Sequence, residues 1–91
     1  DVALEELESC IPATGSVEEV WNAKEVARNI DDFLEHLDSE NRILFVRRYW
    51  YAESVSDLAR LFQISNHNVT VRLSRIREKL KMHLLKEGIW L

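Results

Sequence analysis

Residues 54–80 constrain the fold more than any other part of the chain, because they predict two helices joined by a tight turn. The first helix begins at Ser54 or Ser56 and ends near Gln63. Its apolar residues follow one face of a 3.6-residue repeat: Val55, Leu58, Ala59 and Phe62. Ser65 stands where the hydroxyl of an N-cap accepts a backbone hydrogen bond, so the second helix should start at about Asn66.

The second of these helices has one apolar and one polar face. Apolar residues at spacings of three and four predict a buried stripe: Val69, Leu73, Ile76, Leu80 and Leu84. A turn of about 100° per residue places the following residues opposite that stripe: His67, Val71, Ser74 and Glu78. The flanks are mostly cationic or polar: Thr70, Arg77 and Lys81 on one side, and Asn68, Arg72, Arg75 and Lys79 on the other. Short side chains near base edges and long cations near phosphates suit a DNA groove, so the helix-turn-helix over 54–84 predicts DNA binding.

Charge is unevenly distributed along the chain. Residues 1–41 hold twelve acidic and two basic side chains, a net charge of −10, whereas residues 42–91 hold ten basic and four acidic ones, a net charge of +6. Because the positive charge is gathered on the helix-turn-helix half, we expect that half to face DNA. The acidic half either faces a protein partner or is a solvated linker, and the sequence leaves both open.

The N-terminal half predicts a linker followed by a helix. Residues 1–15 predict a loosely held acidic linker, within which a short amphipathic turn is an alternative: Val2, Leu4, Leu7 and Ile11. A capping box formed by Ser16 and Glu19 opens a long helix that runs up to Asp38. Its apolar stripe is predicted to contain eight residues: Val17, Val20, Trp21, Ala27, Ile30, Phe33, Leu34 and Leu37.

A further helix is predicted from about Ser39 to Tyr51, with Arg47 and Arg48 on or beside its exposed side. Its inward side chains are expected to be Ile43, Leu44, Val46, and Tyr49 or Trp50. No segment alternates apolar and polar residues as a strand would. The 91 residues therefore predict one all-α domain over 16–91, a small bundle of four to five helices with a C-terminal helix-turn-helix.

No group of residues points to catalysis or to a cofactor. His36, His67 and His83 lie far apart and lack the spacing of zinc ligands, and a single cysteine excludes an internal disulfide. The chain has no Gly-rich phosphate loop, no signal peptide pattern and no apolar run long enough to cross a membrane. We therefore expect a cytoplasmic protein that is no enzyme and holds no metal or cofactor. The N-terminal Asp1 suggests a piece of a longer chain.

Two adjoining stretches carry a family resemblance. The turn and second helix read QISNHNVTVRLSRIREKL, and the residues before them read HLDSENRILFVRRYWYAESVSDLARLF. They resemble region 4 of sigma-70-type RNA polymerase sigma factors, whose patterns are G-I-S-x-x-T-V-K-x-R-L-x-R-A-R-x-x-L and L-P-x-x-x-R-x-x-F-x-x-R-Y-x-x-x-x-S-x-x-E-I-A-x-x-L. The upstream residues in register are Leu37, Arg42, Phe45, Arg48, Tyr49, Ser54, Leu58, Ala59 and Phe62. The resemblance extends from near Val26 to Leu85, and the acidic leading segment resembles the linker of the extracytoplasmic-function type.

The resemblance implies promoter DNA at the −35 element as the ligand. It also implies docking on the β flap of core RNA polymerase and sequestration by an anti-sigma factor. Family positions and the start of the second helix together give the expected DNA-binding residues: Arg48, Asn66, His67, Asn68, Thr70, Val71, Arg72, Ser74 and Arg75. Departures from the pattern are Asp38 for Pro, Gln63 for the turn Gly and Thr70 for a cation. The first costs little, because Asp is itself a good N-cap. With Val71 beside it, Thr70 affects which promoter sequence is bound rather than the mode of binding.

Two other functions remain compatible with the sequence. One is the helix-turn-helix output domain of a response-regulator-type transcription regulator, although the R-x-x-x-F-x-x-R-Y block and the acidic linker favour the sigma factor. The other is a sigma-like adaptor that keeps the fold and binds only proteins, which Thr70 and the net charge of −4 permit.

Overall fold

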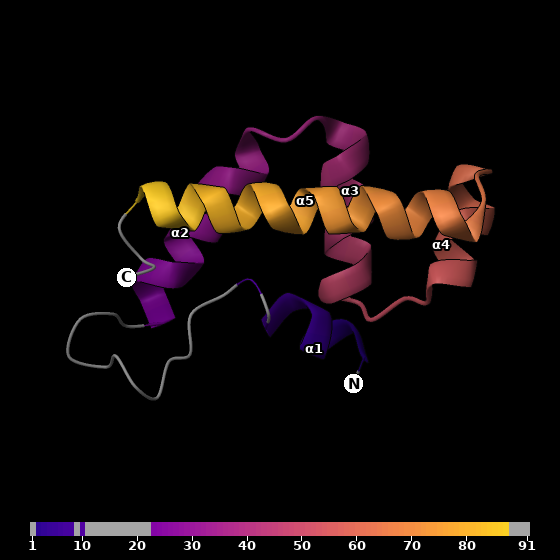
Figure 1. Ribbon diagram of the computed structural model, residues 1–91, viewed down its shortest axis with the longest axis horizontal. Coiled ribbons are helices and arrows are strands. Elements are labelled where there is room, and N and C mark those ends of the chain that lie inside the picture. The colour runs from indigo at the N-terminus through magenta and orange to yellow at the C-terminus, as the bar shows by residue number, and fades with distance from the viewer. Residues whose placement is uncertain (1, 9, 11–22, 88–91) are drawn as a thin grey trace.

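The computed structural model describes residues 2–8, 10 and 23–87, and all regular secondary structure in these residues is helical. The helices are α1 (Val2–Glu8), α2 (Ala23–Glu35), α3 (Ser39–Tyr49), α4 (Val55–Phe62) and α5 (Asn66–Lys86). Figure 1 shows α5 running the length of the molecule, with α2, α3 and α4 along it from its C-terminal to its N-terminal end. The prediction of a small all-α bundle with a C-terminal helix-turn-helix is confirmed.

The core is built around the apolar stripe of α5. All five predicted residues of the stripe are at most 2% exposed: Val69, Leu73, Ile76, Leu80 and Leu84. They belong to one cluster with apolar side chains from α2, α3 and α4, which include Phe33, Phe45 and Leu58. Because every one of these helices packs against α5, the orientation of α5 about its own axis is determined by the core.

α3 begins where the sequence predicts, but its inward face is rotated. Asp38 caps the helix by accepting a hydrogen bond from the Asn41 amide at 3.4 Å, which is the role expected of Asp in place of Pro. Leu44 is buried as predicted, whereas Ile43 is 47% exposed and Phe45, which was not expected inward, is 0% exposed. The rotation occurs because Phe45 makes an edge-to-face contact with Phe33 of α2, at a centroid distance of 6.5 Å.

The apolar stripe of α2 also differs from the predicted one. Ile30, Phe33 and Leu34 are buried as predicted, but Ala27 is exposed and Val26 takes the inward place. The small Ala side chain has little to gain from burial, and the larger Val one position earlier fits the same face of the helix better.

The leading segment contains a short helix. Residues 2–8 form α1, which packs against α3, and Leu7 lies against the core. Cys10 is buried, and its thiol donates a hydrogen bond to the Leu7 carbonyl at 3.1 Å. The division of the chain into a linker over 1–15 and a domain over 16–91 stays a prediction.

Several sequence predictions fall outside the described residues. These are the capping box, the early part of the first apolar stripe and the last residue of the alternative amphipathic turn: Ser16, Glu19, Val17, Val20, Trp21 and Ile11. Within the described part, the helix predicted up to Asp38 ends at Glu35.

The packing of α5 predicts opposite effects for two adjacent substitutions. Leu73→Ala should lower the free energy of unfolding by about 2 to 5 kcal/mol, since it removes a fully buried side chain and leaves a cavity. Ser74→Ala should change it by less than about 0.5 kcal/mol, since Ser74 is exposed. Urea denaturation of the two variants measures both values. The reverse order would mean that the exposed face of α5 is misassigned.

Candidate nucleic-acid interface

The turn between α4 and α5 is made without glycine. Gln63 ends α4 in the left-handed region, with φ 59° and ψ 45°, and its amide donates to the carbonyls of Ala59 and Arg60. The Ile64 amide also donates to the Ala59 carbonyl, at 3.0 Å. These two hydrogen bonds form a common helix C-cap, in which glycine usually takes the left-handed position because it has no Cβ to clash. Gln63 is tolerated here because the hydrogen bonds compensate for the steric cost of its side chain.

Serine caps position both helices of the unit. The Ser54 hydroxyl accepts from the Asp57 amide and the Ser65 hydroxyl accepts from the Asn68 amide, both at 3.0 Å. The Asn66 side-chain amide donates to the Ser56 hydroxyl at 3.2 Å and thereby links the first turns of α4 and α5. The start of α5 therefore has a defined position relative to α4.

The face of α5 opposite the core is polar over its first half. Six of the predicted DNA-binding residues are exposed on α5: Asn66, His67, Asn68, Thr70, Ser74 and Arg75. Val71 and Arg72 are half-buried. Eight of the nine predicted residues therefore lie on α5, where their side chains can contact the same ligand.

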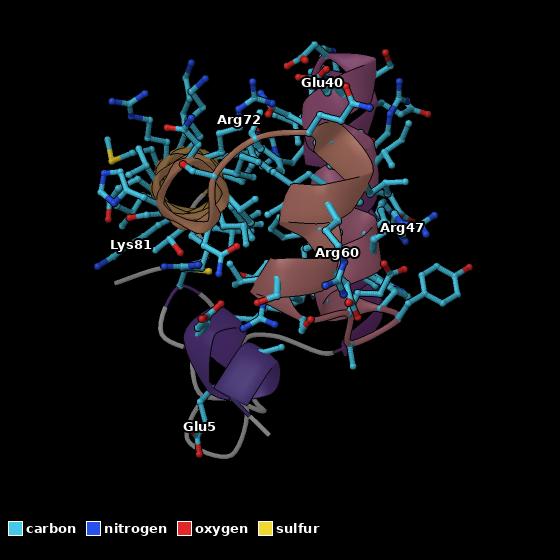
Figure 2. All side chains as sticks on the ribbon, turned by 90° about the vertical axis from the view of Figure 1, so that its right-hand side faces the viewer. Glu5, Glu40, Arg47, Arg60, Arg72 and Lys81 are labelled. Atoms are coloured by element: carbon cyan, nitrogen blue, oxygen red, sulfur yellow. The ribbon has the colours of Figure 1, made fainter. Side chains whose placement is uncertain are left out.

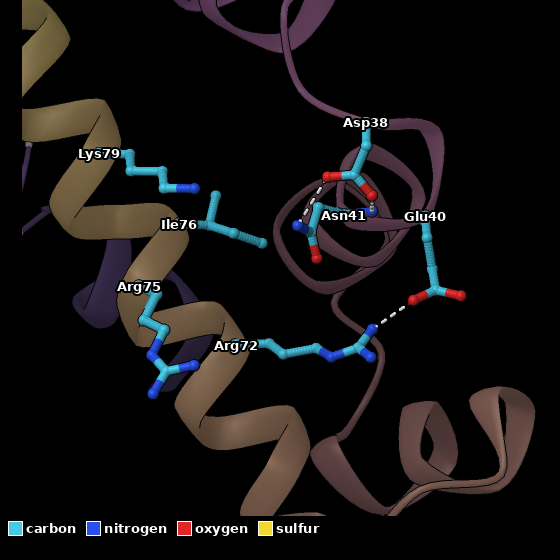
Figure 3. A pocket seen from close by; sticks show the side chains of 7 residues that line it. All are labelled: Asp38, Glu40, Asn41, Arg72, Arg75, Ile76 and Lys79. Carbon is cyan, nitrogen blue, oxygen red and sulfur yellow. Dashed lines mark hydrogen bonds and ion pairs between the residues drawn. The ribbon is translucent and has the colours of Figure 1, made fainter.

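A cationic pocket lies beside this face, between α5 and the start of α3. It has a volume of about 340 Å³ and is lined by Asp38, Glu40, Asn41, Arg72, Arg75, Ile76 and Lys79. Arg72 reaches across it and donates to a Glu40 oxygen at 2.5 Å (Figure 3). Looking along α5, Arg72 and Lys81 lie on different sides of the helix, so cations flank the polar face on both sides (Figure 2).

Arg48 does not lie where the sequence predicted. It is 7% exposed, and its guanidinium donates to the Glu53 carbonyl at 2.9 Å and to a Glu6 oxygen at 3.2 Å. The expectation of an exposed position is wrong, because the rotation of α3 that buries Phe45 also turns Arg48 inward. Its expected contact with the DNA backbone stays a prediction.

Three residues next to the predicted set also belong to the surface around α5. Asn41 and Lys79 line the cationic pocket, and Arg77 donates to the Tyr49 hydroxyl at 2.6 Å. The helical spacing of α5 already marked Lys79 and Arg77 as flanking cations. Nothing in the local sequence marks Asn41, because its place depends on how α3 meets α5.

The described residues also bear on metal binding and on membrane insertion. In that part of the chain, no group of three or more His, Cys, Asp or Glu side chains is arranged to hold a metal ion. None of its helices is both long enough and apolar enough to cross a bilayer.

The α4–turn–α5 unit, with a polar and cation-flanked face opposite the core, defines a helix-turn-helix DNA-binding domain. The model of the family described as Sigma-70, region 4 matches residues 27–80. The chain therefore belongs to the sigma-70 region 4 family, whose members are DNA-binding domains of transcription regulation and not enzymes. Searches of curated proteins and of solved structures found no match to this chain.

Proposed function

We propose that this domain recognises the −35 element of a promoter through α5 and docks on core RNA polymerase, so that transcription starts at that promoter. The observation that carries the proposal is the exposed polar face at the start of α5, held in place by the Ser65 cap and the turn at Gln63. Membership of the sigma-70 region 4 family supports it. Such a function would place the protein in the cytoplasm.

The first turns of α5 carry the side chains suited to base edges. Asn66, His67 and Asn68 are exposed at the helix start, and Thr70 and Ser74 follow on the same helix. Amide and hydroxyl groups can donate to and accept from bases in the major groove, and the Val71 methyl groups can contact a thymine methyl. Together these groups would determine the promoter sequence.

The cationic pocket supplies contacts for the DNA backbone. Arg75 and Lys79 are exposed, so they can reach phosphates without a change in the fold. Arg72 is paired with Glu40, and a phosphate would have to take the place of that carboxylate. The side chains of Arg72 and Glu40 are 37% and 55% exposed, so exchanging one anion for another on this partly exposed guanidinium requires little free energy, because surface ion pairs are weak.

An apolar groove near the end of α5 supports docking on a protein. It has a volume of about 730 Å³ and is lined by Phe33, Lys79, Met82, His83, Leu85 and Lys86. Met82 is 60% and Leu85 41% exposed. Clustered exposed apolar side chains mark protein interaction sites, and in this family the β flap of RNA polymerase is the expected partner. An anti-sigma factor remains a proposed second partner.

A sigma-like adaptor without DNA binding is the competing function. Its support is the acidic character of the first 41 residues and Thr70 at a position where the family usually has a cation. The family match favours a sigma factor domain over a response-regulator output domain, but both remaining functions share the fold. Titration with promoter DNA distinguishes them.

The first functional prediction concerns Arg75. The Arg75→Gln variant should bind promoter DNA more weakly, and the slope of log K against log salt should become shallower by about 0.9, the value for one lost phosphate contact. Arg28→Gln, the same charge change on an exposed residue of α2, is the control and should leave the slope unchanged. Fluorescence anisotropy at several salt concentrations measures both. Equal slopes in Arg75→Gln and the wild type would contradict this interface.

The second concerns Val71 and sequence preference. Val71→Ser removes two methyl groups and adds a hydroxyl, so it should change the preference at one or two base pairs by about 1 to 3 kcal/mol each. Non-specific affinity should stay nearly constant, since no charge is altered. Selection from randomised −35 sites shows the change. Identical selected sites would assign base recognition to Asn66, His67 and Asn68 instead.

The third concerns the apolar groove. Met82→Gln should weaken binding of an isolated β-flap fragment about tenfold, the size of effect expected when a side chain central to an interface is replaced. Leu61→Gln, a change of an exposed apolar residue on α4 outside the groove, is the control. Binding can be measured by calorimetry. A loss with Leu61→Gln alone would move the docking surface to α4.

A further inference from the structure

One carboxylate of α1 is surrounded by polar groups from α3 and α5. Glu6 accepts from the Arg48 guanidinium at 3.2 Å, from the Tyr49 hydroxyl at 2.9 Å and from the Arg77 guanidinium at 3.3 Å. We call Arg48, Tyr49 and Arg77 the Glu6 cluster. The residues that meet there are 42, 43 and 71 positions from Glu6 in the sequence.

The cluster has the features of an anion site that exists before its ligand arrives. Arg48 is 7% exposed and is held by the Glu53 carbonyl at 2.9 Å, and its buried Nε has no hydrogen-bond partner in the described part of the chain. Arg77 is held by the Tyr49 hydroxyl at 2.6 Å. Two guanidinium groups therefore stand fixed around one carboxylate, and guanidinium groups bind phosphate with the same geometry.

Tyr49 adds a neutral donor to the cluster. Burial raises the pKa of its hydroxyl to about 12, and the hydrogen bond to Glu6 also raises it, while Arg77 opposes the shift. The hydroxyl therefore keeps its proton at neutral pH and can donate to an anion. Without an anion in this place, two buried or half-buried positive charges would be uncompensated, which is unfavourable.

The cluster adjoins the proposed DNA-binding face. Thr70, Ser74 and Arg77 stand at i, i+4 and i+7 on α5, so they form a line about 10 Å long on one side of the helix. Figure 1 shows α1 below α5 and the lower end of α3, and Figure 2, which looks along α5, shows α1 on one side of that helix. A DNA strand that follows the line from Thr70 would reach Arg77 where Glu6 now binds.

We propose that the Glu6 cluster is a second binding site for the DNA backbone, and that Glu6 competes with a phosphate for it. This inference rests on the proposed function, since the phosphate belongs to the same bound DNA. In the structure described here α1 covers the cluster. When DNA binds, a phosphate replaces the Glu6 carboxylate on Arg77, Tyr49 and Arg48, and α1 moves away from α3. The N-terminal helix thus lowers the affinity of the domain for DNA.

The test compares two neighbouring glutamates of α1. Glu6→Gln keeps the shape of the side chain and removes its charge. The full chain with this change should bind promoter DNA about tenfold more tightly at low salt, because the competing anion is gone. Its salt slope should match that of the wild type, because the same phosphate occupies the cluster in both complexes. Glu5→Gln is the matched control, because Glu5 is exposed and points away from the cluster (Figure 2).

A double variant and an exchange measurement complete the test. Adding Arg77→Gln to Glu6→Gln should make the salt slope shallower than that of the wild type by about 0.9, because the phosphate contact of Arg77 is then lost. In the wild type, hydrogen exchange of the amides of residues 2–8 should become faster when DNA is added. This measurement needs no variant, so it does not depend on how well the variants fold. Slower or unchanged exchange on DNA binding would overturn the proposal.

The outcomes also separate this inference from the proposed function. If Glu5→Gln and Glu6→Gln raise affinity equally, the effect is net charge alone. The inference is then wrong, whereas −35 recognition through α5 stands. If neither the wild type nor any variant prefers promoter DNA to other DNA, both the proposed function and the inference fail.

Discussion

The burial of one helical stripe on α5 determines most of this structure. Helices α2, α3 and α4 all pack against that stripe, and the residues between Val69 and Leu84 that form it are almost completely buried. The same helix carries the polar face proposed to bind DNA. Because side chains on a helix have fixed angular positions, burial of Leu73 places Ser74 and Thr70 at the surface. The packing that stabilises the core therefore also determines the direction in which the proposed DNA-binding face points.

The turn before α5 adds the second constraint. Gln63 adopts a left-handed conformation that glycine takes more easily, and two amides close the end of α4 onto the Ala59 carbonyl. Serine caps on both sides limit where each helix can begin. The angle between α4 and α5 then follows from a few local hydrogen bonds together with the packing of Leu58, so the unit can present α5 to a groove as a rigid element.

Acidic side chains of the same chain compensate the cations around α5. Glu40 pairs with Arg72 on one flank, and Glu6 pairs with Arg77 and Arg48 on the other. From the sequence alone, the acidic first half could be a solvated linker or a surface for a protein partner. In the described residues, part of it faces the basic half of its own chain instead. In the proposed complex with DNA, phosphates would take the place of these carboxylates, and the affinity would depend on how firmly α1 and α3 hold their glutamates.

The sequence alone determined the features that depend on local periodicity and on the capping residues at helix ends. The buried stripe, the Ser65 cap, the Asp38 cap and the helix-turn-helix follow from spacing within a few residues. Only the tertiary structure decided which side of α3 is inward, so Phe45 and Arg48 were misplaced and Glu6 was not singled out. The physical reason is distance along the chain. Helical periodicity predicts only approximately which side of a helix faces the core. Contacts with residues 42 to 71 positions away in the sequence determine the exact rotation of the helix and its ion pairs.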